Sequence, residues 1–348
     1  MRKIMVILVL LFLTSFGFAD KVADLPAVLK PSVIITDGQS FFFSQDYSVY
    51  NYSLKTFKEV AKFVSKGQGP GEIAEDPPYL ALYSDLILVY SDGKCLWYTK
   101  DGKLQRELKI PRENVEILPA KDGYISSRFF PDEKEQHVYI KFFLLDSKFE
   151  SKTQLYQTVY DVNVSWGAQR EAGFKNFKMI TYFVGVGYQD EKIFIGDSSK
   201  GFFIDVYDLN GKHLYTIQKD DEVKKIEIDE DYKKKLLDEF RVVAPNVWPY
   251  VKDNNYVFYK HFPQIRNFFV ADGKIYVLTF KKENDRYEMI VLDLKGKILK
   301  RLLLPFKGMR YYVRPGLRDT LTVKNGKVYE LVENLDTEMY ELHTYQIE

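Results

Sequence analysis

The residue types that carry out catalysis occur in this 348-residue chain, but not at spacings that bring catalytic groups together. The sequence has no His-Glu-x-x-His, no Gly-x-Ser-x-Gly, no Gly-x-x-x-x-Gly-Lys-Ser/Thr and no cysteine pair. Residues 67–71 are glycine-rich in the manner of a phosphate-binding loop, but Pro70 lacks an amide donor and no Lys-Ser pair follows. We interpret this loop as a tight turn between two structural units, with phosphate binding as the alternative.

Four acidic residues that each lie close to a predicted strand are the candidates for metal ligands. Their carboxylate oxygens are the ligands that calcium prefers in proteins. They are not spaced as a cluster, and an Asp-Gly pair such as residues 272–273 is explained more simply by a turn. We therefore expect no metal and no other cofactor, and we keep as the alternative a calcium site made by Glu72, Asp92, Asp197 and Asp272.

Arginine, tryptophan and histidine residues in predicted loops and insertions are the candidates for ligand binding. Such side chains recognise carboxylates, sugars and the aromatic groups of peptides. Of the other histidines, His213 is expected to be an exposed hairpin residue, and His137 and His343 are expected on outer strands or at the surface. The candidate binding residues are Arg128, Trp166, Arg241, Trp248, His261 and Arg266.

A recurring strand-turn-strand pattern positions these residues. Residues 203–217 form an apolar strand, a turn that begins with Asp and ends with Gly, and a second strand, and residues 289–302 and 96–108 repeat the pattern. Asp can accept hydrogen bonds from the turn backbone, and Gly tolerates a positive φ. The flanking residues are β-branched or aromatic and partly alternate with polar ones, which is typical of half-buried strands. The pattern therefore predicts β-hairpins.

The hairpins recur roughly every 40–50 residues, as expected of a repeat architecture in which each unit packs on its neighbours. Six strand-rich units result, and the last one is a strand short. A lone strand at residues 27–35 precedes the first unit and would complete the last sheet, so that the ring closes without an open edge. The sequence thus predicts an all-β fold, a six-bladed β-propeller whose last blade is closed by an N-terminal strand. Its units are residues 40–66, 79–110, 115–160, 179–218, 264–305 and 320–348.

One segment departs from the strand pattern. At residues 229–243, Tyr232, Leu236, Phe240 and Val243 recur at helical spacing with Lys and Glu between them. We predict one short amphipathic helix within an insertion of about residues 221–262.

The first residues have the organisation of a secretory signal peptide. Arg2 and Lys3 precede an apolar run, and small residues at positions 17 and 19 suit cleavage before Asp20. The run is short for a membrane span, although an uncleaved anchor is the alternative. No cysteine follows it for a lipid anchor, and no second apolar stretch is long enough to span. We expect a signal peptide at residues 1–19 and a single exported domain at residues 20–348, periplasmic or extracellular.

Composition excludes some classes of partner. Removing Arg2 and Lys3 from the 50 basic residues leaves 48 against 49 acidic residues, a net charge near −1. A nucleic-acid partner would require clustered excess basic charge, so we expect none. The single Cys95 cannot form an internal disulfide, and its strand context predicts a small buried side chain.

The loop at residues 67–72 (Gly-Gln-Gly-Pro-Gly-Glu) resembles that of bacterial six-bladed β-propeller proteins related to the NHL-repeat family, where such a loop leads into the next blade. Residues 274–277 with 292–297 resemble a blade of that family, as does Pro263 ahead of the fifth unit. The Asn-x-Arg that often follows the first blade strand in that family is absent after Val89. The resemblance implies the propeller fold, and the family includes binding platforms, lyases and lactonases.

Complete repeat patterning without a catalytic motif favours a non-enzymatic function. We predict an exported binding or scaffold protein, monomeric, that presents one face to a protein, peptide or glycan. The alternative is a metal-assisted hydrolase or lyase of the lactonase or NHL-lyase type, with its site on the propeller axis.

Overall fold

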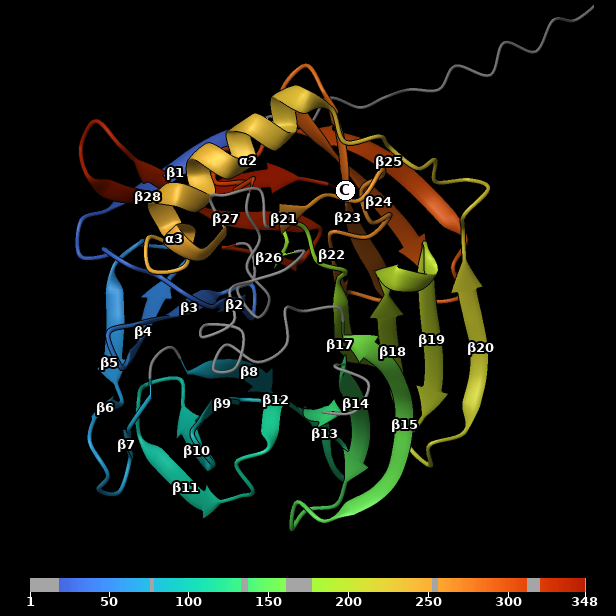
Figure 1. Cartoon of the computed structure of the whole chain (residues 1–348). Coiled ribbons are helices and arrows are strands. Elements are labelled where there is room, and N and C mark those ends of the chain that lie inside the picture. The colour runs from blue at the N-terminus through green and yellow to red at the C-terminus, as the bar shows by residue number, and fades with distance from the viewer. Residues whose placement is uncertain are drawn as a thin grey trace, which may run out of the picture.

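The computed structural model describes residues 19–75, 78–132, 137–160, 177–251, 256–311 and 320–347. Six four-stranded antiparallel sheets stand round a common axis (Figure 1). From the axis outward, the first three blades are β2 (Ile34–Thr36), β3 (Ser40–Gln45), β4 (Ser48–Ser53) and β5 (Glu59–Phe63); β8 (Tyr79–Tyr83), β9 (Leu86–Ser91), β10 (Lys94–Thr99) and β11 (Leu104–Lys109); and β12 (Asn114–Ala120), β13 (Gly123–Asp132), β14 (His137–Leu145) and β15 (Ser151–Tyr160). The predicted all-β, six-bladed propeller is confirmed.

The other three blades follow the same order. They are β17 (Val184–Gln189), β18 (Lys192–Asp197), β19 (Phe203–Asp208) and β20 (His213–Gln218); β22 (Asn267–Ala271), β23 (Lys274–Glu283), β24 (Arg286–Asp293) and β25 (Ile298–Leu304); and β26 (Leu321–Lys324), β27 (Lys327–Asn334), β28 (Met339–Gln346) and β1 (Ala19–Leu25). Short pieces lie in the connections: β6 (Ser65–Lys66), β7 (Glu72–Ile73), β16 (Phe177–Lys178), the 3-10 helix η1 (Ser198–Lys200) and β21 (Tyr256–Val257).

The innermost strands close a ring, because each contacts the innermost strand of the next blade and β26 contacts β2. The core is divided accordingly into apolar clusters between neighbouring blades. Phe42, Leu80 and Leu96, for example, fill the space between the first and second blades. Each sheet therefore buries both faces against its neighbours, which a single hairpin cannot do.

The predicted Asp-Gly turns form as expected. In the fourth blade the Asp208 carboxylate accepts hydrogen bonds from the backbone N–H groups of Asn210 and Lys212 at 2.8 and 2.9 Å. Gly211 has φ +81°, and a Cβ there would lie 2.7 Å from the side chain of Thr153 in the third blade. Glycine is thus required both by the turn and by the close approach of the neighbouring blade.

An N-terminal strand does close the last blade, but it is not the strand at residues 27–35. β1 (Ala19–Leu25) pairs antiparallel with β28, from Ala19 opposite Tyr345 to Leu25 opposite Tyr340. Part of the segment expected to close the ring forms β2 instead, the innermost strand of the first blade. An innermost strand is covered on both faces, whereas an outermost strand is partly exposed to solvent. The continuous apolar run Val33-Ile34-Ile35 therefore suits an innermost strand better than an outermost one.

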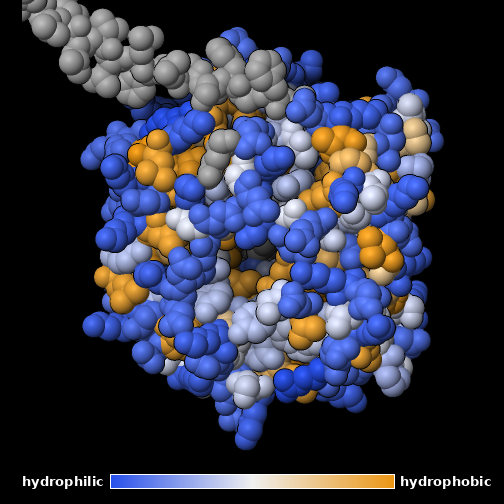
Figure 2. All heavy atoms as spheres, turned by 180° about the vertical axis from the view of Figure 1, so that it is seen from behind, coloured by the Kyte–Doolittle hydropathy of each residue, from blue (hydrophilic) through white to orange (hydrophobic). Residues whose placement is uncertain are grey.

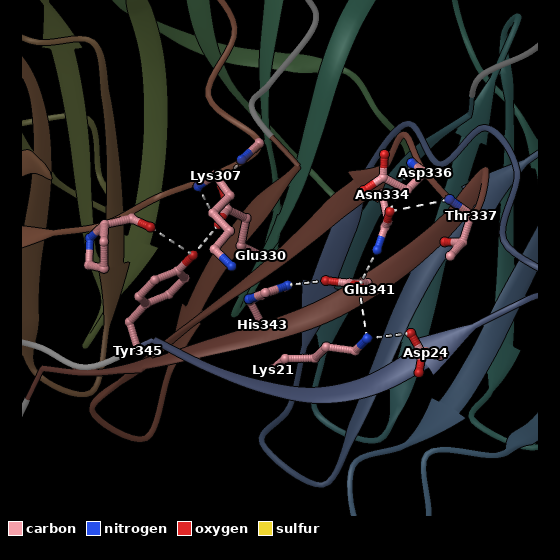
Figure 3. A network of polar contacts seen from close by, with 12 residues as sticks. Lys21, Asp24, Lys307, Glu330, Asn334, Asp336, Thr337, Glu341, His343 and Tyr345 are labelled. Carbon is pink, nitrogen blue, oxygen red and sulfur yellow. Dashed lines mark hydrogen bonds and ion pairs between the residues drawn. The ribbon is translucent and has the colours of Figure 1, made fainter. Parts of the chain in front are cut away.

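A polar network connects β1 to β28, where the N-terminal strand closes the last blade (Figure 3). Glu341 of β28 accepts hydrogen bonds from Lys21 Nζ and from Asn334 Nδ2, each at 2.8 Å, and lies 2.7 Å from His343 Nε2. His343 is 1% exposed, so our expectation of a surface histidine is wrong at this position. The hydrogen bonds from Lys21, Asn334 and His343 lower the pKa of Glu341 to about 2.

This pKa predicts a pH dependence of stability. Because the folded-state pKa of Glu341 is depressed from 4.5 to about 2, its stabilising contribution is present above about pH 4.5 and is lost as the pH falls toward 2. Glu341→Gln should therefore be less stable than the wild type at pH 7, and the difference should shrink between pH 4.5 and 2. Urea unfolding of both proteins across this range measures it. A difference that stays constant down to pH 3 would contradict the assignment.

The insertion contains α2 (Glu230–Val243) and the short α3 (Trp248–Val251). The Asp229 side chain caps α2 by accepting a hydrogen bond from Tyr232 N at 2.7 Å. Leu236 and Phe240 are fully buried, as the helical spacing predicts, in a cluster that joins the insertion to residues 177–180, but Val243 is 44% exposed. Within the described residues, no helix has the length and apolar character of a membrane span.

Cys95 is fully buried between the second and third blades. Burial raises the pKa of its thiol to about 12, so almost no thiolate forms at pH 8. We expect the native protein to resist a disulfide-exchange reagent such as Ellman's reagent, and to react with one equivalent after unfolding in guanidinium. Rapid reaction of the native protein would contradict the buried placement.

Candidate binding surface

The two ends of the propeller are built differently. We call the insertion face the end that carries residues 221–262 and the turns at residues 91–94 and 334–339, and the turn face the opposite end, with hairpin turns such as residues 208–213 and 293–298. In Figure 1 the insertion face is toward the viewer and α2 crosses in front of the strands. Figure 2 shows the turn face, which is mostly hydrophilic round a central hollow. The long connections of the chain thus gather on one face.

Exposed hydrophobic side chains are distributed in the same uneven way. Of the large ones in the described chain, four lie at the turn-face ends of outermost strands, at Val60, Leu104, Leu214 and Leu299. The others lie on the insertion face or on strand ends that reach it, and none lies in the described turns of the turn face. They are Leu29, Val115, Phe129, Phe130, Val159, Val242, Val243, Val257 and Leu335.

The third blade reaches beyond its two neighbouring blades on this side, because β13, β14 and β15 are ten, nine and ten residues long and β9, β10, β18 and β19 have six residues each. Phe130, Tyr139 and Val159 are paired across these strands and share one face of the sheet. Lys141 Nζ lies 4.7 Å from the Phe130 ring centre. This group of apolar side chains on the third blade was not predicted from the sequence. The adjacent phenylalanines at 129 and 130, at the end of a long strand pattern, were a usable signal.

Arg128 lies at the base of this extension. It is 9% exposed, its Nε donates to Asn114 Oδ1 at 2.9 Å, and its guanidinium lies 4.9 Å from the Phe143 ring centre. Nη1 is 3.7 Å from Glu113. These contacts orient Arg128 within the blade and leave little of it accessible to a ligand.

The structure brings two other candidates together. The Arg241 guanidinium lies 4.9 Å from the Trp248 ring centre, at the end of α2 next to the exposed Val242 and Val243. His261, half-buried, forms a backbone bridge with Glu227, where the insertion rejoins the propeller. Trp166 lies outside the described residues. The insertion thus contributes the Arg241–Trp248 cation–aromatic pair to the insertion face.

Arg266 has a packing role. It is 4% exposed, its Nη2 donates to the backbone carbonyl of Arg310 at 2.8 Å, and its guanidinium lies over the rings of Phe280 and Tyr287 at 5.3 and 5.7 Å. It therefore braces the segment that follows the fifth blade, beneath α2.

The four acidic candidates lie apart, each with its own partners. Asp92 pairs with Arg112 at 3.1 Å, and the fully buried Asp197 accepts from Tyr156 Oη at 2.7 Å. Asp272 lies on the turn face, 3.0 Å from Lys324 Nζ. In the described part of the chain, no three His, Cys, Asp or Glu residues are grouped as a metal ion would require.

The innermost strands, which surround the axis, are largely apolar. Among their described residues Glu116 is the only acid, and it accepts a hydrogen bond from Tyr79 Oη at 2.9 Å. The half-buried aliphatic side chains on these strands include Ile35, Leu82 and Val186. The hollow in Figure 2 therefore opens between strands that are poor in charged groups.

The loop at residues 67–72 surrounds the ammonium group of a lysine side chain, Lys94. The Lys94 ammonium donates to the backbone carbonyls of Gly69 and Glu72 at 2.9 and 3.0 Å and lies 3.2 Å from Glu107. The amides of Gly69 and Gly71 donate to the carboxylates of Glu72 and Glu107, so these donors are already used within the protein. The loop is built around an ammonium group, which supports the interpretation of a structural turn.

We expect Lys94→Met to lower the free energy of unfolding by about 2 kcal/mol, because the carbonyls and Glu107 lose their cation. The control is Lys103→Met in the same blade. Lys103 pairs with Asp101 but is 76% exposed, and its loss should cost less than about 0.5 kcal/mol. Urea unfolding compares the two, and equal effects would show that the loop does not depend on the Lys94 ammonium.

No protein-family model and no curated protein matches the chain. Among solved structures, the chain is similar in fold to BamB from Moraxella catarrhalis (10% identity, 90% of this chain and 84% of that one, TM-score 0.38) and to BBS1N in complex with ARL6DN (10%, 91% and 78%, 0.42). It is also similar to the RRP9 WD40 repeats (8%, 95% and 100%, 0.47). At these identities the likeness describes the fold alone.

Proposed function

We propose that the chain is a binding protein that contacts a partner polypeptide with its insertion face. The observation that carries the proposal is the distribution of exposed hydrophobic side chains, nine of which lie on or reach this face. Soluble proteins tolerate single exposed apolar residues, but several gathered on one face are typical of an interaction surface. The cation–aromatic pairs Arg241–Trp248 and Lys141–Phe130 add residue types that are common in binding hot spots.

A polypeptide fits this surface better than a glycan does. Glycan sites rely on flat aromatic rings and hydrogen-bonding side chains, whereas the most exposed hydrophobic residues here are aliphatic. Leu335 is 81% exposed and Val242 is 76% exposed. Aliphatic side chains gain most from burial against other apolar side chains, which a polypeptide partner supplies.

We place this function outside the cytoplasm. The predicted cleavage before Asp20 falls at the start of β1, so that processing would leave residues 20–25 to close the ring. The signal-peptide pattern predicted at residues 1–19 supports export and a periplasmic or extracellular location.

The test uses the chain from residue 20 and a display library of random twelve-residue peptides, with a glycan array in parallel. We expect selected peptides to bind, with a hydrogen-exchange footprint on the insertion face. At least one of Phe130→Asp, Val243→Asp and Leu335→Asp should weaken binding tenfold or more. Leu299→Asp, at a site 47% exposed on the outermost strand β25, should change it less than twofold. A footprint on the turn face, or binding of glycans alone, would overturn the proposal.

A further inference from the structure

The outermost strands of the six blades differ in how well they are protected against pairing with another chain. An edge strand presents unpaired N–H and C=O groups, and proteins commonly protect such edges by keeping them short or by placing charges on them. β5, β11, β20, β25 and β1 are five to seven residues long. Four of them carry two or more charged residues, such as Lys300 and Arg301 on β25, and the fifth, β20, has His213 beside Asp205.

β15 (Ser151–Tyr160) is the exception. It has ten residues and one charged side chain, Lys152, at its turn-face end. The remainder, Thr-Gln-Leu-Tyr-Gln-Thr-Val-Tyr, is rich in β-branched and aromatic residues. It is the last strand of its sheet, and no described segment pairs with its outer edge. Figure 1 shows it as a long curved strand on the outside of the ring.

One exposed apolar side chain on this edge strand would contact an added strand. Val159 is 39% exposed and shares a sheet face with Tyr139 on β14 and Phe130 on β13, which lie one and two strands farther in. An added strand would therefore lie next to Val159 and three strand spacings from β13.

We infer that the insertion-face half of β15 pairs with an extended segment of the partner polypeptide, which becomes a fifth strand of the third blade. The edge favours this occupant, because another backbone in extended conformation can pair with the whole row of alternating N–H and C=O groups. Its side chains alternate between the two faces of the sheet, so an apolar residue on the segment would lie beside Val159 on one face. The inference rests on the proposed function and deepens it by naming the site and the mode of binding.

The experiment uses the same selected peptides and a matched pair of variants. Val159→Lys places a charge on the proposed edge, and Leu214→Lys does so on the outermost strand β20, where the side chain is equally exposed at 39%. We expect Val159→Lys to weaken peptide binding at least tenfold and Leu214→Lys to leave it within twofold. Circular dichroism and thermal unfolding establish that both variants are folded. In the wild type, the amides of residues 154–160 that point away from β14 should exchange quickly and become protected when the peptide binds.

The outcomes separate this inference from the proposed function. If Val159→Lys binds like Leu214→Lys while an aspartate variant of Val243 or Leu335 binds weakly, the partner uses the insertion face but not this edge. If the β15 amides that point away from β14 are already protected in the free protein at every concentration, another part of the chain covers the edge, and the inference is wrong. Protection that grows with protein concentration would assign the edge to a second copy of the chain, which also overturns it.

Discussion

A chain that begins at residue 32, and therefore lacks β1, should lose most of its stability. Leu25 and Val28 are fully buried between the sixth and first blades, and their burial is worth on the order of 5 kcal/mol. Without β1, the outer edge of β28 is open and Glu341 loses Lys21. We expect the unfolding temperature to fall by roughly 10 °C or more and the truncated protein to bind a hydrophobic dye.

Adding the missing strand as a peptide provides the control for this experiment. A synthetic peptide of residues 20–31 should bind the truncated chain and restore the unfolding temperature toward that of the intact protein. The same peptide with Leu25→Asp should not, because the carboxylate would be buried in an apolar cluster. A truncated chain that unfolds at the wild-type temperature would show that the ring does not depend on this strand for closure.

The closing strand also shows how far sequence could predict this fold. Hairpins recur visibly because the turn chemistry of Asp and Gly is local, as at Asp208 and Gly211. The number of blades and the need for an N-terminal closing strand follow from counting these repeats. The identity of that strand does not, because β1 (Ala-Asp-Lys-Val-Ala-Asp-Leu) is polar at several positions and has no hairpin partner next to it in sequence. Its pairing with β28 depends on a contact between the two ends of the chain.

The residues of the proposed binding surface were harder to predict than the fold. Arg128 and Arg266 were among the candidates because the sequence alone does not distinguish an exposed loop arginine from an arginine that packs against aromatic rings. The rings over Arg266 come from two strands of the following hairpin, Phe280 on β23 and Tyr287 on β24. Conversely, exposure of Phe129 and Phe130 depends on the third blade reaching beyond its neighbours, which requires the lengths of all blades to be compared.

Replacing Glu330 should destabilise the fold more than replacing Lys94 does. The Glu330 carboxylate is fully buried and accepts hydrogen bonds from the backbone N–H groups of Gly308 at 2.8 Å and Lys307 at 3.2 Å, and from Tyr345 Oη (Figure 3). Glu330→Ala would leave these buried donors without their acceptor. We expect the free energy of unfolding to fall by about 3–5 kcal/mol in urea unfolding experiments.

Two further variants make the result specific. Tyr345→Phe removes one donor and leaves the two backbone contacts, so it should cost only about 1 kcal/mol. Glu333→Gln changes an exposed carboxylate on the same strand and should cost less than about 0.5 kcal/mol. Equal costs for Glu330→Ala and Tyr345→Phe would mean that the backbone contacts contribute nothing.

The same substitution should also loosen the insertion face. Glu330 fixes the start of the segment that follows the fifth blade, and farther along this segment Tyr311 contacts α2: its N–H donates to Glu239 at 2.8 Å and its carbonyl accepts from Tyr232 Oη at 3.0 Å. A buried carboxylate between two blades is thus linked through one short segment to the helix on the proposed binding face. In native-state hydrogen exchange, Glu330→Ala should speed exchange in α2 more than in the first blade, and equal acceleration in both would contradict this linkage.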